Sequence, residues 1–254
     1  MPRLGLIQYR NEGNLGNTIQ TYGLMHLVTP DFWVWYDNIS FESDGVIICN
    51  GWFESLYQKI DTRAKAIFAG IHVTSEPGYT NEQTLEWMRR NRKVVGARDP
   101  ETAEYLNSVG IEAQFVGCAS LLLPRYDGPR KGVVFVDYDS ARDLTHWIPA
   151  TMTWEVKLKK AMHMLSIYRT AEAVYTSRLH VALPCIAVGT PVCVKPDPDI
   201  RRFSILESLG VAYNQLATLD VRPLRERFTA FVNAQCSLLG QSDGNHDGSP
   251  HPLP

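Results

Sequence analysis

The sequence predicts an α/β fold, with two α/β domains in tandem and a cleft between them. Short apolar runs that end in turn residues alternate with helical segments, a pattern that favours parallel sheets with helices on both faces. The composition changes to proline, glycine and charged residues at 124–131, as is typical of a linker. We therefore expect an N-terminal domain at 1–127 and a C-terminal domain at 128–240.

Each expected element is an apolar run or an amphipathic segment bounded by glycine, proline or polar turn residues. In the N-terminal domain we expect strands at 4–8, 31–37, 45–51, 66–72, 93–99 and 113–117, and helices at 18–28, 80–91 and 100–109. In the C-terminal domain we expect strands at 132–137 and 191–194, and helices at 155–170, 203–209 and 222–239. The stretch 174–191 predicts a strand, a polar turn and a buried helix, in that order, and the helix stops at Gly-Thr-Pro. Residues 241–254 contain little that could be buried, so we expect a disordered tail.

The composition of the 254 residues excludes several classes of function. A formal charge of −2 gives no electrostatic reason to expect a nucleic acid or an anionic membrane as partner. No stretch approaches the roughly 20 apolar residues of a membrane span, and the N-terminal apolar run is too short for a signal peptide. The five cysteines form no C-x-x-C pair, and no cluster has metal-ligand spacing. We expect a reduced, cytoplasmic protein without a bound metal.

Two groups that can handle an anion and a proton lie where the 174–176 strand passes into the following helix. Ser177, Arg178 and His180 lie in a polar turn between the strand and the helix, at the carboxyl end of a strand where open α/β sheets bind ligands. The guanidinium matches a carboxylate or phosphate, and imidazole suits proton transfer near neutral pH. An alternative remains open at this point: the arginine pairs with a carboxylate of its own domain, and the histidine is a hydrogen-bonded core residue.

The glycine-rich turn at 13–17 follows the first strand and does not match the G-x-G-x-x-G pattern of dinucleotide sites. Gly13 allows backbone N–H groups to approach a phosphate or a sugar, or it simply permits a tight turn. Asn17 and Gln20 are the side chains best placed to reach the cleft.

Two further strand ends carry candidate ligand-binding side chains. His72 ends one predicted strand, and Arg98 ends another. Asp99 precedes a helix that begins with proline, so we interpret it as the N-cap, which leaves Arg98 as the freer member of the pair. Aromatic residues could stack on a sugar face but are more often core residues.

In this order and spacing, four segments resemble the polysaccharide pyruvyl transferase family. Residues 11–24 resemble its N-x-G-N…Q-x-Y-x-L opening, and residues 95–110 are similar to its R-D…L…G segment. Residues 117–123 resemble a G-C-P-S-L variant. Residues 176–191 match the T-S-R-L-H…G-x-P signature, the most specific of the four.

The resemblance implies two Rossmann-like domains in a GT-B-like arrangement. It also implies transfer of a pyruvyl group from phosphoenolpyruvate to sugar hydroxyls in glycan biosynthesis, which yields a ketal and phosphate with no cofactor beyond the donor substrate. Arg178 and Arg98 would neutralise the carboxylate and phosphate of the donor, and His180 would exchange a proton. The expected catalytic residues are His180 and Arg178, and the expected substrate-binding residues are Arg98, Asn17, Gln20, Gly13, His72 and Ser177. The partners are then a small-molecule donor and a carbohydrate acceptor.

Two other functions suit the same predicted fold, because a fold does not determine a function. One is a GT-B glycosyltransferase with a nucleotide-sugar donor, although no acidic residue stands clearly in place for a ribose. The other is a non-catalytic module that binds a sugar or an anion without turnover.

Overall fold

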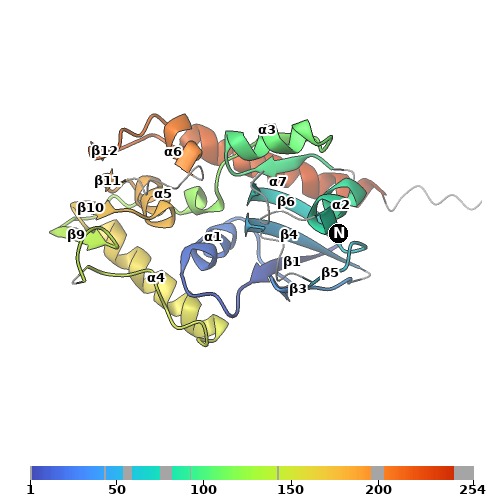
Figure 1. Ribbon diagram of the computed structural model, residues 1–254, viewed down its shortest axis with the longest axis horizontal. Coiled ribbons are helices and arrows are strands. Elements are labelled where there is room, and N and C mark those ends of the chain that lie inside the picture. The colour runs from blue at the N-terminus through green and yellow to red at the C-terminus, as the bar shows by residue number, and fades with distance from the viewer. Residues whose placement is uncertain are drawn as a thin grey trace, which may run out of the picture.

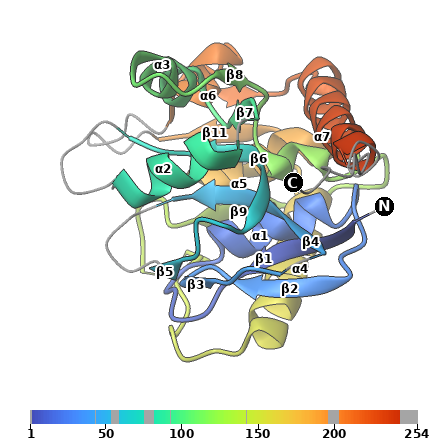
Figure 2. The same ribbon diagram turned by 90° about the vertical axis from the view of Figure 1, so that its right-hand side faces the viewer.

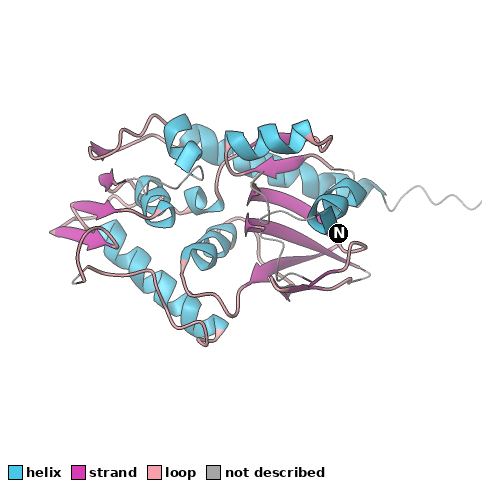
Figure 3. Ribbon diagram, viewed as in Figure 1, coloured by secondary structure: helices cyan, strands magenta, loops and turns pink. Residues whose placement is uncertain are grey.

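A computed structural model describes residues 2–42, 44–53, 59–74, 82–91, 93–141, 143–195 and 203–242. Within these ranges the chain forms two β-sheets with helices packed around and between them (Figure 1). Figure 3 shows the strands as two separate groups at opposite ends of the molecule, with helices between the groups. The predicted α/β class with two Rossmann-like, GT-B-like halves is confirmed.

The larger sheet has the strand order β5-β3-β2-β1-β4-β6-β7-β8. Its strands are β1 (Arg3–Gln8), β2 (Phe32–Trp35), β3 (Asn38–Ile39), β4 (Gly45–Trp52), β5 (Lys59–Ile60), β6 (Lys65–His72), β7 (Val95–Ala97) and β8 (Ala113–Phe115). Every pairing is parallel except that of β2 with β3. From β1 the chain first adds β2 on one side and later β4 on the other, so the strand order reverses at β1. Ligands bind open sheets at such a reversal, beyond the carboxyl ends of the strands.

Helices cover both faces of the larger sheet because neighbouring strand residues point to opposite sides. On one side Leu6 packs in a cluster with Leu24 of α1 (Gly16–Leu24) and Phe228 of α7 (Arg222–Ser242). On the other side Ile7 packs in a cluster with Trp87 of α2 (Glu82–Asn91) and Leu106 of α3 (Pro100–Ser108). Figure 2 shows α7 beside this larger sheet, although α7 is the last helix of the described chain.

The smaller sheet has the order β12-β11-β10-β9. Strands β9 (Val133–Val136), β10 (Ala173–Thr176) and β11 (Val192–Val194) are parallel, and β12 (Leu216–Ala217) is antiparallel to β11. Helices α4 (Trp154–Thr170), α5 (Leu179–Val188) and α6 (Ser204–Ser208) pack with it in one core cluster. Gly189 ends α5 in the left-handed conformation, as the predicted Gly-Thr-Pro stop requires.

Helix α1 joins the two halves. It contacts β1 and β4 of the larger sheet, and also α4, α5 and the short 3-10 helix η1 (Ala119–Leu122). Gly23 permits the approach to η1, because a Cβ atom at this position would lie 2.2 Å from the carbonyl oxygen of Ala119. The start of α1 is therefore fixed relative to both sheets, and the glycine-rich turn before it lies between them.

Most predicted elements form within a few residues of their expected ends, while the two-residue strands and η1 were not predicted. Gln241 and Ser242, expected in the tail, belong to α7, and residues 243–254 lie outside the described part. The division into domains at residue 127 stays a prediction. Helix α7 was predicted within the C-terminal domain, and in the structure it packs on the larger sheet, which the N-terminal residues form. Over the described residues, we find no helix with both the length and the apolar character of a membrane span.

Candidate active site

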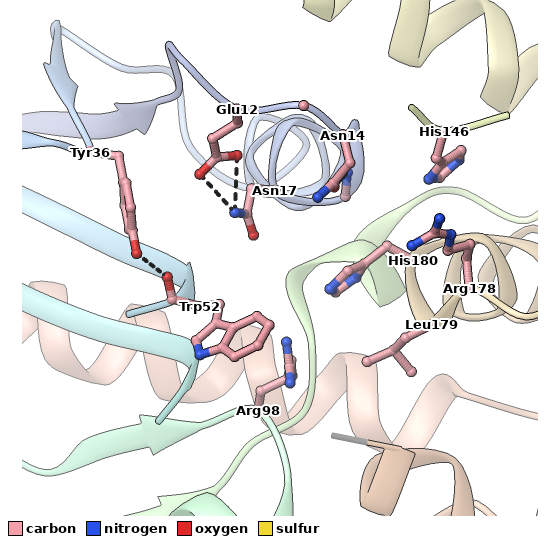
Figure 4. Close-up of a pocket in the computed structure, with 12 residues that line it drawn as sticks. Glu12, Asn14, Asn17, Tyr36, Trp52, Arg98, His146, Arg178, Leu179 and His180 are labelled. Atoms are coloured by element: carbon pink, nitrogen blue, oxygen red, sulfur yellow. Dashed lines mark hydrogen bonds between the residues drawn. The ribbon is translucent and has the colours of Figure 1, made fainter. Parts of the chain in front are cut away.

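A cavity of about 240 Å³ lies between the two halves, at the carboxyl ends of their strands (Figure 4). This volume is below the roughly 300–1,000 Å³ of typical drug-sized sites, which suits a small ligand. The cavity is lined by Glu12, Gly13, Asn14, Gly16, Asn17, Tyr36, Trp52, Arg98, His146, Arg178, Leu179 and His180. Five of the eight residues predicted for the site are in this set: Gly13, Asn17, Arg98, Arg178 and His180.

The glycine-rich turn is held by the C-terminal half of the chain. The Ile148 N–H donates to the Gly13 carbonyl at 2.8 Å, and the Leu15 N–H donates to the His146 carbonyl at 3.1 Å. The Lys157 ammonium is buried and donates to the Glu12 carbonyl at 3.0 Å. These contacts fix the turn as one wall of the cavity, since its backbone polar groups are satisfied by the opposite half.

A buried arginine enters the cavity from the end of β7. Arg98 is 1% exposed, and its Nε donates to Asp99 Oδ2 at 3.2 Å, so the two members of the predicted pair contact each other. Its Nη2 is buried and forms no hydrogen bond within the described residues. Figure 4 shows the guanidinium beside Trp52, pointing toward the cavity. A buried donor without a protein partner is costly and suits an anionic ligand.

Asp99 connects Arg98 to His72 and to α3. Its Oδ1 accepts from the Thr102 N–H at 2.9 Å, which confirms the predicted helix cap, and its Oδ2 lies 2.7 Å from His72 Nδ1. Burial raises the pKa of Asp99, but the hydrogen bond with His72 and the charge of Arg98 outweigh burial and hold this pKa well below its usual range. His72 lies outside the cavity lining and contacts the carboxylate that orients Arg98.

Arg178 is held by a carboxylate and an aromatic ring of the C-terminal half. Its Nε donates to Asp137 Oδ2 at 3.1 Å, and its guanidinium carbon lies 4.5 Å from the centre of the Trp147 ring. Neither Nη atom forms a hydrogen bond within the described residues. The predicted alternative of a structural ion pair is therefore present, yet Arg178 also lines the cavity. Ser177 lies outside the lining set, and its hydroxyl donates to the Asp137 carbonyl at 2.5 Å.

His180 faces α1 across the junction of the two halves. Its Nε2 lies 3.3 Å from Nε2 of Gln20, and Gln20 lies outside the lining set. A Cβ atom on Gly16 would lie 2.9 Å from Cδ2 of His180, so the glycine gives the imidazole room to reach the helix. His180 has φ −84° and ψ 16°, which departs from helical geometry at the start of α5.

His146 is a second imidazole at the cavity and remains neutral. It is 2% exposed, and its Nε2 lies 2.6 Å from the Tyr168 hydroxyl. Burial lowers the pKa of His146 to about 4, while the charge of Asp137 raises this pKa by a smaller amount and the charge of Arg178 lowers it. His180 is therefore the better candidate for proton exchange near neutral pH.

Several lining residues were not among those predicted from the sequence. Glu12 follows β1, Tyr36 follows β2 and Trp52 ends β4, so the rule that sites lie at strand ends could have found them. His146 lies in a loop and carries no such signal. No group of three or more histidine, cysteine or acidic side chains that could hold a metal ion occurs within the described ranges.

Comparisons with known proteins agree with this architecture. One solved structure, of an uncharacterised protein from Klebsiella pneumoniae, matches with a TM-score of 0.55 and 16% identity over 80% of this chain and 88% of that one. A UDP-N-acetylglucosamine 2-epimerase matches with a TM-score of 0.51 and 11% identity over 99% of both chains. These likenesses show the fold alone, and no curated protein matches the chain. The family model for polysaccharide pyruvyl transferase matches residues 14–195, and the chain therefore belongs to this family.

Proposed function

We propose that the protein transfers a pyruvyl group from phosphoenolpyruvate to two hydroxyl groups of a sugar. The observation that carries the proposal is the pair of guanidinium groups, Arg98 and Arg178, that reach one small cavity together with His180. Phosphoenolpyruvate is a small molecule with two anionic groups, a carboxylate and a phosphate. Two cations with unused donors match it better than they match an uncharged sugar.

In the proposed reaction both sugar oxygens form bonds to C2 of the donor, and the bond from C2 to the phosphate oxygen breaks. One sugar hydroxyl loses a proton, and the C3 methylene of the donor gains a proton and becomes a methyl group. The second proton leaves with the phosphate. No electrons are exchanged with another molecule, so the reaction needs no redox cofactor.

The cavity offers a side chain for each of these demands. His180, in its doubly protonated form, supplies the proton to C3, a contribution that is typically worth about 10²–10⁴-fold in rate. The Glu12 carboxylate also lines the cavity, and we assign it the role of the base that accepts the proton of the attacking hydroxyl. Arg98 and Arg178 stabilise the charge that develops on the departing phosphate.

The experiment incubates the purified protein with phosphoenolpyruvate and a panel of glycosides that carry neighbouring hydroxyl groups. We expect phosphate release that depends on the acceptor, together with a new ketal methyl signal in the NMR spectrum of the product. His180→Gln should lower the rate by about 10²–10⁴-fold. Phosphate release that persists unchanged in this variant would contradict the assignment.

The same samples separate the proposal from a nucleotide-sugar glycosyltransferase. Binding of phosphoenolpyruvate should raise the melting temperature of the protein, since a ligand of the native state stabilises it by mass action. Arg178→Lys should weaken this effect, because lysine lacks the planar fork of donors. Stabilisation by UDP-sugars without any response to phosphoenolpyruvate would instead favour the glycosyltransferase.

A further inference from the structure

A continuous chain of polar side chains runs from Glu12 to His180. Both carboxylate oxygens of Glu12 accept from Asn17 Nδ2 at 3.1 Å. Asn17 Oδ1 accepts from Gln20 Nε2 at 3.0 Å, and this same nitrogen lies 3.3 Å from His180 Nε2. Figure 4 shows Glu12 and Asn17 on one side of the cavity and His180 on the other. These hydrogen-bonded side chains therefore link a carboxylate of the N-terminal half to an imidazole of the C-terminal half.

Each member of the chain sets the direction of the next hydrogen bond. An ionised carboxylate only accepts, so Glu12 requires Asn17 to present its amide nitrogen, which turns the Asn17 oxygen toward Gln20. That oxygen in turn requires Gln20 to present its own amide nitrogen. The Gln20 nitrogen is then the group that faces His180, and an amide nitrogen can only donate.

A second contact fixes the Gln20 amide independently of Asn17. Gln20 Nε2 lies 3.4 Å from the carbonyl oxygen of Gly16, which cannot donate. Gln20 Oε1 accepts from Cys118 Sγ at 3.5 Å. A reversed amide would place oxygen against oxygen at both Gly16 and Asn17.

We infer that Glu12, Asn17 and Gln20 act as positioning residues that hold neutral His180 in the tautomer with its proton on Nδ1. Because Gln20 donates to Nε2, this nitrogen offers its lone pair, and the single N–H of the neutral ring must be on Nδ1. We call the hydrogen-bonded side chains of Glu12, Asn17 and Gln20 the relay. The relay determines which ring nitrogen of His180 carries the proton. The inference concerns the ring itself and does not depend on which reaction the protein catalyses.

The test is a long-range ¹H–¹⁵N correlation spectrum of the full ¹⁵N-labelled chain at a pH of about 8, where imidazole with an ordinary pKa near 6.5 is neutral. Protonated and unprotonated ring nitrogens have well separated ¹⁵N shifts. The chain has 7 histidines, so the signals of His180 are identified by their loss in His180→Gln. We expect Nδ1 to be protonated in the wild type, and a protonated Nε2 would overturn the inference.

Variants of Gln20 then test what sets the tautomer. Gln20→Met keeps the length of the side chain but cannot donate, so we expect the Nε2-protonated form to appear. Gln20→Glu supplies an acceptor, so we expect that form to predominate. The matched control is Thr21→Val on the same helix, whose hydroxyl donates to the Ile7 carbonyl at 3.1 Å outside the relay. An unchanged spectrum in both Gln20 variants, or an equal change in Thr21→Val, would overturn the relay.

Rate measurements on the same variants separate this inference from the proposed function. If both hold, Gln20→Met should lower kcat more than it changes KM for the donor, because the relay orients the proton-transfer group and does not bind the anion. If the spectra show the expected tautomers but no pyruvyl transfer occurs in any protein, the relay stands and the proposed function fails.

Discussion

Arg178 donates from Nε to Asp137 Oδ2 at 3.1 Å, while its guanidinium carbon lies 4.5 Å from the centre of the Trp147 ring. Asp137 adopts a positive φ of 45°, and its Oδ2 also accepts from the His146 N–H at 3.0 Å. The backbone thus fixes the position of the Asp137 carboxylate independently of its contact with Arg178. One edge and one face of the guanidinium are occupied, and the Nη groups stay available to a ligand.

Asp137→Asn should weaken donor binding while the fold is kept. Asparagine tolerates the positive φ and can still accept from His146, but it no longer supplies a charge to hold Arg178. We expect KM for phosphoenolpyruvate to rise about tenfold, which corresponds to about 1.4 kcal/mol. The control is Asp139→Asn, which removes an exposed ion pair with Lys195 and should leave KM unchanged. Equal effects in the two variants would contradict the role of Asp137.

Asp99→Asn should destabilise the fold, because it leaves Arg98 as a buried charge without a counter-ion. The expected loss is about 3–5 kcal/mol in the free energy of unfolding at neutral pH, measured by urea titration. The pKa of Asp99 is lower in the folded chain than in the unfolded chain, so the stability it contributes is present above its ordinary pKa near 4 and is lost as the pH falls further. The gap between wild type and variant should therefore narrow in acid, and a constant gap would contradict this account.

The sequence predicts the fold well where local patterns decide the structure. The apolar runs of β1, β4, β6 and β10 and the stop at Gly189 could be identified because burial and turn chemistry are local properties. The two-residue strands β3 and β5 could not, since each is too short to show a pattern of its own and is defined by its pairing: β3 with β2 and β5, and β5 with β3. The return of α7 to the larger sheet is likewise a tertiary contact that an amphipathic pattern does not specify.

The candidate site divides along the same line. Arg98, Arg178 and His180 were predicted because they follow strands and have distinctive chemistry. Sequence reasoning could not separate residues that line the cavity from residues that orient them. His72 and Gln20, both predicted to bind substrate, lie just outside the lining set and contact Asp99 and Asn17. Whether a residue lines the cavity or contacts a lining residue depends on the direction of its side chain and on packing between the two halves of the chain.

His146 should make the protein sensitive to mild acid. Its pKa is about 4 in the folded chain against about 6.5 when unfolded, so between these values the unfolded chain binds more protons and stability falls as the pH decreases. We expect this residue to contribute a loss of about 2 kcal/mol between pH 7 and pH 5. Urea titrations should show a smaller pH effect in His146→Gln than in wild type. An equal pH effect in both proteins would show that another group is responsible.

Gly16→Ala should separate activity from stability. Alanine favours a helix over glycine by about 0.5–1 kcal/mol, so α1 itself should not lose stability. The added Cβ would, however, lie 2.9 Å from His180 Cδ2 and 3.0 Å from Asn14 Oδ1, so the imidazole must move. We expect at least a tenfold loss of kcat with little change in melting temperature, because small displacements of a reacting group are costly.

Gly23→Ala provides the contrast on the same helix. Its Cβ would lie 2.2 Å from the Ala119 carbonyl oxygen, a backbone atom that cannot rotate away, so α1 must separate from η1. Overpacking of this kind costs about 1–3 kcal/mol, and we expect a lower melting temperature.

If Gly16→Ala retained full activity, the His180 imidazole would have room to move without consequence. The contact between α1 and His180 would then have no part in positioning the ring for catalysis.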